Sequence, residues 1–135
     1  MSERKKELII EFEYLEQQIK LSSEKLDALD TQAAQLQTSI QAIKTISQKN
    51  EHEALVPIVN GVYVNATIQK TDSFLVDVGS DVATPKTATE AIKVFEFQLS
   101  STHEYQEKVV QRLELLSKHA DELQKEMSSL TQQVK

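Results

Sequence analysis

The sequence predicts an α+β fold: a long antiparallel coiled-coil helical hairpin with two β-hairpins inserted between its helices. Three observations predict it. A heptad stripe lies toward each end of the chain, the hydrophobic period changes from 3.5 to 2 in the middle, and 135 residues contain only two Gly and two Pro. The two stripes have nearly equal length, so helices that fold back on each other would bury both. We expect one subunit spanning residues 1–135.

The first helix is expected over residues 3–49. Moving along it by alternately three and four residues reaches an apolar residue at every position except Ser22. Neither Pro nor Gly interrupts the run. A helix of this length cannot stand alone in water and needs a partner for its stripe. The stripe consists of Leu8, Phe12, Leu15, Ile19, Ser22, Leu26, Leu29, Ala33, Leu36, Ile40 and Ile43.

The second helix is expected over residues 88–134, and its stripe runs in one phase from Ala88 to Val134. Thr87 and Glu90 have the spacing of a capping box, which predicts Thr87 as the N-cap. An antiparallel register places Leu8 near Met127 and Leu29 near Gln106. The middle of the helix pair is therefore less apolar than its ends, which either fixes the register or lets the pair splay.

Two β-hairpins are expected within residues 54–86. Residues 62–68 alternate apolar and polar side chains, as a half-buried strand does, and Asn60-Gly61 before them favours a type I′ turn. Residues 74–78 form a third apolar run, which Gly79-Ser80-Asp81 turns into a fourth strand. Pro57 and Pro85 lack an amide donor, which confines them to strand ends, edges or bulges.

Four short strands do not close a core of their own, because isolated hairpins are marginal in water. The helices lead away from these strands and would cover only part of them. We therefore expect the strands to pair with strands of other subunits.

Charge and composition exclude several functions. The formal net charge is −6 and no basic tract exists, which disfavours nucleic acid. The sequence contains no signal peptide and no apolar run near the roughly 20 residues that span a bilayer, so we expect a cytoplasmic protein without a membrane partner.

No catalytic or metal site is expected. Cysteine is absent, and His52, His103 and His119 lie too far apart to form a ligand pattern. The two glycines are isolated, so no phosphate-binding loop exists. The aspartates of the predicted turns lack the ligand spacing of a calcium loop and are interpreted as turn formers. The protein is expected to be no enzyme and to need no cofactor.

The order helix, two hairpins, helix resembles the alpha class of prefoldin subunits, archaeal prefoldin alpha and its eukaryotic relatives such as subunit five. The residues that carry the resemblance are Leu55-Val56-Pro57, Tyr63-Val64, Leu75-Val76-Asp77-Val78-Gly79-Ser80, Lys86-Thr87 and Glu90-Ala91. A second glycine usually follows the one matched by Gly79, and Ser80-Asp81 stands in its place here.

The resemblance implies an ATP-independent holdase, a hexamer of two alpha-class and four beta-class subunits. It implies that the strands contribute to an oligomeric β-barrel, and that the coiled-coil tips capture unfolded proteins and deliver them to a group II chaperonin. The implied assembly residues are Leu55, Val62, Val64, Ile68, Phe74, Val76, Val78 and Gly79.

A client-binding surface is expected where the start of the first helix meets the end of the second. The candidate residues are Leu8, Ile9, Ile10, Phe12, Leu15, Met127, Leu130 and Val134. Ile9, Ile10 and Tyr14 lie off the main stripe and give more apolar surface than one partner helix covers. They either bind clients or widen the packing stripe. The alternative function is a structural coiled-coil protein that assembles or tethers partners without holding clients.

Overall fold

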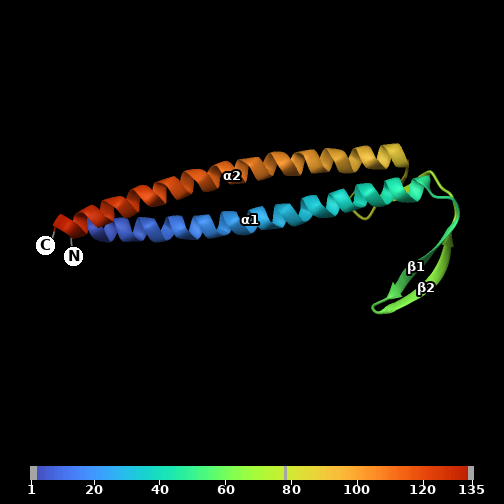
Figure 1. Cartoon of the computed structure of the whole chain (residues 1–135), viewed down its shortest axis with the longest axis horizontal. Helices are drawn as coiled ribbons and strands as arrows, with labels where there is room; N and C mark the ends of the chain where they lie inside the picture. The colour runs from blue at the N-terminus through green and yellow to red at the C-terminus, as the bar shows by residue number, and fades with distance from the viewer. Residues whose placement is uncertain (1–2, 78, 134–135) are drawn as a thin grey trace. The chain divides into compact units, whose positions relative to one another are not determined.

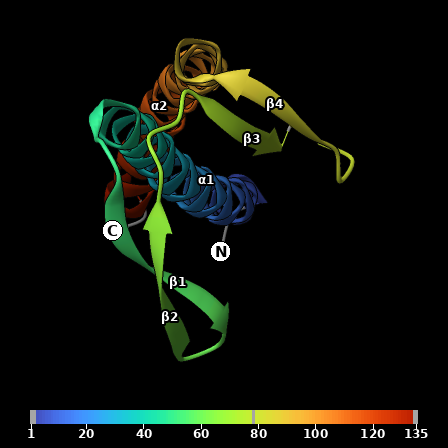
Figure 2. The ribbon, with the colours of Figure 1, turned by 90° about the vertical axis from the view of Figure 1, so that its right-hand side faces the viewer.

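The computed structural model describes residues 3–77 and 79–133 and has the predicted fold class. Its elements are helix α1 (Glu3–Gln48), strands β1 (His52–Val59), β2 (Val62–Ile68), β3 (Ser73–Asp77) and β4 (Ala83–Thr87), and helix α2 (Ala88–Gln133) (Figures 1 and 2). The chain divides into two compact units. The arm unit comprises residues 1–33 and 101–135, and the strand unit comprises residues 34–100.

In the arm unit, α1 and α2 pack antiparallel through their apolar stripes. The buried core is formed by Leu8 and Leu15 of α1 and by Ala120 and Leu123 of α2. Half-buried apolar residues surround it, namely Phe12, Ile19, Leu116, Met127 and Leu130. Leu8 and Met127 belong to one cluster, as the antiparallel register predicts.

The strand unit contains two separate antiparallel two-stranded sheets, β1–β2 and β3–β4 (Figure 2). In the first, Val56 lies opposite Val64 and Val59 opposite Val62, and the register shifts between Pro57 and Val59. In the second, Leu75 lies opposite Pro85. The described chain contains no closed barrel.

The turn between β1 and β2 differs from its prediction. A type I′ turn needs positive φ at both central residues, and among the described residues Gly61 has φ 81° whereas Asn60 is not in this region. The type I′ prediction is therefore wrong. The bulge beside Pro57 shifts the register just before the turn, and a bulge adds twist of its own.

The predicted turn after β3 is present. The Gly79 amide donates to Asp77 Oδ1 at 2.8 Å, and the Val82 amide donates to the Gly79 carbonyl at 3.1 Å. Ser80 and Asp81 have φ 54° and 58°, so two residues that carry a Cβ adopt the left-handed conformation.

Candidate functional site

The first hairpin presents an apolar face that nothing in the strand unit buries fully. Side chains of paired residues lie on the same side of a sheet, so the register places seven apolar residues on one face, together with His52. We call this the apolar hairpin face: Ala54, Val56, Val59, Val62, Val64, Ala66 and Ile68. Val56, Val59, Val62 and Val64 are exposed, and the other three are half-buried.

The opposite face of the same hairpin is mixed. Leu55 and Tyr63 are 67% and 60% exposed, and they share this face with Glu53, Asn65 and Thr67. A two-stranded sheet that exposes both faces is marginal in water. It gains stability only when another surface covers it.

The second hairpin is partly buried on one face. Val76 is buried and Phe74 half-buried, whereas Leu75 on the other face is 74% exposed. The predicted assembly residues thus divide into exposed Leu55, Val62 and Val64, half-buried Ile68 and Phe74, and buried Val76. Gly79 lies in the turn with φ 104°. Val78 lies outside the described residues.

The predicted client-binding residues also divide by burial. Leu8 is 0% exposed and Leu15 is buried beside it, so both belong to the helix seam. Phe12, Met127 and Leu130 are half-buried around this core. Ile9 is half-buried, and Ile10 is 68% exposed. Val134 lies outside the described residues.

Ile10 is part of a second apolar stripe on α1. Tyr14 follows it by four residues and Leu21 by eleven, and all three are exposed. At about 100° per residue they share one helix face, roughly 130° around the helix from Leu8 and Leu15. We call these three residues the outer stripe. Ile10 and Tyr14 therefore do not widen the seam. Leu21 was not predicted as part of this surface, although its spacing from Tyr14 places it on the same helix face.

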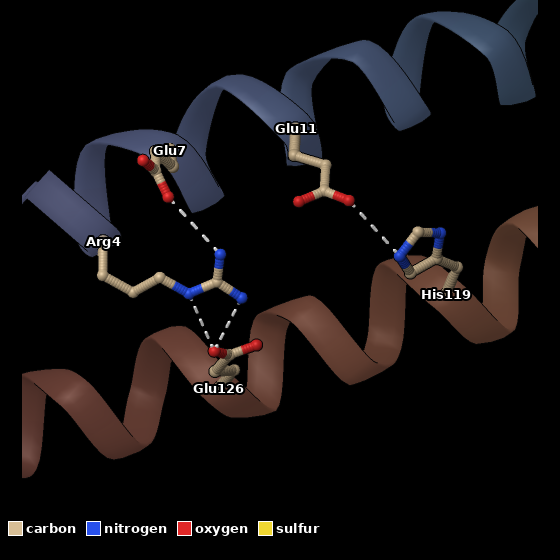
Figure 3. Close-up of polar contacts among 5 residues, drawn as sticks. All are labelled: Arg4, Glu7, Glu11, His119 and Glu126. Carbon is tan, nitrogen blue, oxygen red and sulfur yellow. Dashed lines mark hydrogen bonds and ion pairs between the residues drawn. The ribbon is translucent and has the colours of Figure 1, made fainter.

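Polar contacts join the two helices near the start of α1 (Figure 3). Arg4 Nη2 lies 3.0 Å from Glu126 Oε1, and His119 Nε2 lies 3.5 Å from Glu11 Oε1. The hydrogen bond and charge of Glu126 raise the pKa of Arg4 above its usual value. These contacts are exposed, so each adds little stability. They link the first turns of α1 to α2.

Among the residues that the structure describes, no three His, Asp or Glu side chains approach closely enough to hold a metal. A shallow hollow of about 660 Å³ is lined by residues of α1 alone, from Ala34 to Ile46. No described helix combines the length and apolar character that a membrane crossing requires.

Comparison with known proteins gives concordant results. The family model "Prefoldin subunit" matches residues 15–133. The prefoldin subunit alpha of Thermofilum pendens is 31% identical over 119 residues, covering 87% of this chain and 90% of that protein. The subunit alpha of Pyrococcus horikoshii is 27% identical over 137 residues, covering 98% and 93%.

A solved structure has the same fold. It is a chain of filamentous PFD from Methanocaldococcus jannaschii, superimposed with a TM-score of 0.72 at 22% identity, covering 82% of this chain and 93% of that one.

Proposed function

This chain belongs to the prefoldin family and resembles its alpha subunits throughout, and from that membership we propose that it is the alpha-class subunit of an ATP-independent holdase. In this proposal two copies assemble with four beta-class subunits into a cytoplasmic hexamer. The hexamer captures unfolded proteins at its coiled-coil arms and delivers them to a group II chaperonin. The chain has no catalytic role.

The apolar hairpin face supports the assembly part of the proposal. It leaves Val56, Val62 and Val64 exposed on one side of a hairpin that is too small to be stable by itself. Strands of neighbouring subunits that enclose this face in a barrel would remove it from water.

The exposure of the outer stripe is the observation that supports the proposed holding activity. Ile10, Tyr14 and Leu21 are exposed on α1, on a face that does not pack against α2. An exposed apolar strip without a pocket suits weak contacts with many unfolded sequences, and several arms would raise the affinity through avidity. In the closed helix pair Leu8 and Leu15 are buried, so they contact a client only if the helices separate.

Aggregation of an unfolded test protein distinguishes a holdase from a tethering protein. The complex with a beta-class subunit is mixed with the denatured test protein, and light scattering is followed. We expect the wild-type complex to suppress scattering. The double variant Ile10→Ser/Tyr14→Ser is expected to assemble normally but to suppress several-fold less.

The matched control is Leu115→Ser, since Leu115 is 70% exposed on α2 of the same unit but outside the outer stripe. It is expected to retain full suppression. Equal suppression by the double variant and the wild type would refute the outer stripe as the client surface. An assembled wild-type complex that suppresses nothing would favour the tethering function.

A further inference from the structure

Asn60 and Gly61 form the exposed connection between β1 and β2, and this dipeptide is chemically reactive. An asparagine side chain loses ammonia when the amide nitrogen of the next residue attacks its carboxamide carbon. The attack is fastest when the next residue is glycine, because a Cβ on that residue hinders the approach. Of the three asparagines in the chain, only Asn60 precedes a glycine. The sequence therefore singles out Asn60.

The structure leaves both groups of this reaction accessible. Asn60 and Gly61 are exposed. Apart from its two neighbours in the chain, no described residue has an atom within 4 Å of the position that a Cβ on Gly61 would occupy. No hydrogen bond to another described residue holds the Asn60 carboxamide. Water and hydroxide therefore reach the connection, and the Asn60 side chain can rotate toward the Gly61 amide.

The other two asparagines provide comparisons within the same molecule. Asn50 and Asn65 are exposed as well, so exposure does not distinguish Asn60 from them. Asn50 lies between α1 and β1 and is followed by Glu51, whereas Asn65 lies within β2 and is followed by Ala66. Both therefore precede a residue that carries a Cβ, and the β1–β2 ladder also fixes the backbone of Asn65.

We propose that Asn60 is a site of spontaneous deamidation in the folded protein. The Gly61 amide nitrogen gives its proton to hydroxide and bonds to Asn60 Cγ, which closes a five-membered succinimide ring. The bond from Cγ to Nδ2 breaks, and Nδ2 takes a proton from water and leaves as ammonia. Water then opens the ring at either carbonyl, so the products are aspartate and isoaspartate. Overall one water is consumed and one ammonia released, and nothing is oxidised or reduced.

The inference does not depend on the proposed function, since the reaction needs only this chain and water. Both products change the connection between the strands. The new carboxylate is ionised at neutral pH, so the formal charge of residues 50–90, which hold six acidic and two basic side chains, changes from −4 to −5.

Isoaspartate also lengthens the connection. Its main chain runs through Cβ, which adds one methylene between Val59 and Val62, the last pair of the ladder. Because loop length fixes the register of a hairpin, we expect isoaspartate to disturb this pair first.

Peptide mapping by mass spectrometry tests the proposal on the full chain. The folded protein and the same protein in urea are incubated in mildly alkaline buffer, and the conversion of amide to acid is followed at each asparagine. In the folded chain we expect Asn60 to convert at least about tenfold faster than Asn50 and Asn65, at a rate that rises with pH. Similar rates at all three asparagines would overturn the proposal. So would conversion of Asn60 in urea only, because the folded connection would then protect it.

The products and a variant test the part assigned to Gly61. The succinimide gives isoaspartate together with aspartate, and labelling by an isoaspartyl methyltransferase detects the isoaspartate. Asn60→Gln keeps an exposed carboxamide but cannot close the same five-membered ring, so we expect conversion at position 60 to slow by at least about tenfold. Unchanged rates at Asn50 and Asn65 are the control for an intact fold. Aspartate as the sole product, or equally fast conversion in the Asn60→Gln variant, would show direct hydrolysis of an exposed amide and overturn the attack by Gly61.

Discussion

The side chains of three residues each accept a hydrogen bond from a backbone amide at the start of α2. Thr87 Oγ1 accepts from the Glu90 amide at 3.2 Å, and Glu90 Oε1 accepts from the Thr87 amide at 3.1 Å, which confirms the predicted capping box. Asp72 Oδ1 accepts from the Ala88 amide at 3.2 Å. The sequence could not reveal this last contact, because Asp72 is sixteen residues away and was interpreted as a turn former.

The capping box predicts a pH dependence at Glu90. Hydrogen bonds from the Thr87 backbone and side chain, together with Lys86 and Lys93, lower the pKa of Glu90 below its usual value. The folded chain therefore holds its proton less tightly than the unfolded chain. The carboxylate stabilises the helix start fully above the ordinary glutamate pKa, and this contribution is lost as the pH falls through the lowered folded pKa.

NMR titration of the Glu90 carboxyl measures this effect in the folded chain and in urea. We expect a lower midpoint in the folded chain, and we expect the Thr87 amide shift to titrate with the carboxyl. The difference in stability between wild type and Glu90→Ala should shrink as the pH falls. Identical midpoints in the two states would show that the hydrogen bond does not persist in solution.

Between the two helices, a polar cluster joins α1 and α2 in the arm unit. Gln106 Nε2 donates to Asp30 Oδ1 at 2.7 Å, while Gln106 Oε1 lies 2.7 Å from His103 Nδ1. Since Gln106 Oε1 can only accept, His103 Nδ1 must carry the proton. Lys25 lies 4.6 Å from the centre of the Tyr105 ring. This cluster favours the role of a register device over a section that merely weakens the pair.

A double-mutant cycle measures the contribution of that cluster. Asp30→Ala and Gln106→Ala each break the interhelical bond, and we expect a coupling free energy of about 0.5–1.5 kcal/mol from denaturant unfolding, as for a typical hydrogen bond. The control cycle uses Gln18→Ala and Arg112→Ala, whose contact is longer at 3.4 Å. Its coupling should be smaller. Strictly additive effects of Asp30→Ala and Gln106→Ala would contradict the register role.

The elements differ in how far the sequence determined them. Both helices could be predicted because an unbroken heptad stripe has one solution, a partner helix. The hairpins could be predicted from alternation and turn residues, but the bulge at Pro57 and the conformation of Asn60 could not, since both depend on how the prolyl residue fits the ladder. For the candidate site, the heptad phase placed Leu8 on the seam and Ile9 and Ile10 off it. It did not separate half-buried Ile9 from exposed Ile10, because that depends on how the helices pack.

For the molecule as a whole, the apolar face that still lacks a covering surface lies in the strand unit. The arm unit buries its seam within the chain, through Leu8, Leu15, Ala120 and Leu123. The first hairpin leaves most of its apolar residues in water. The free energy of covering that face is therefore available to drive assembly and is not consumed in folding the single chain.

A charge placed on the apolar hairpin face tests this division. Val64→Asp puts a carboxylate in the surface proposed to become buried, whereas Thr67→Asp puts the same group on the opposite face of β2. Burying an unpaired carboxylate costs several kcal/mol, so we expect Val64→Asp to abolish the complex with a beta-class subunit and Thr67→Asp to weaken it far less. Both variants should retain the helical circular dichroism of the wild type, because the seam of the arm unit is untouched. Val64→Thr, close to Val64 in shape, should give an intermediate effect in light-scattering mass measurements. If Val64→Asp assembles as well as Thr67→Asp, this face remains in water in the complex, and the hairpins must meet their partners through their other side.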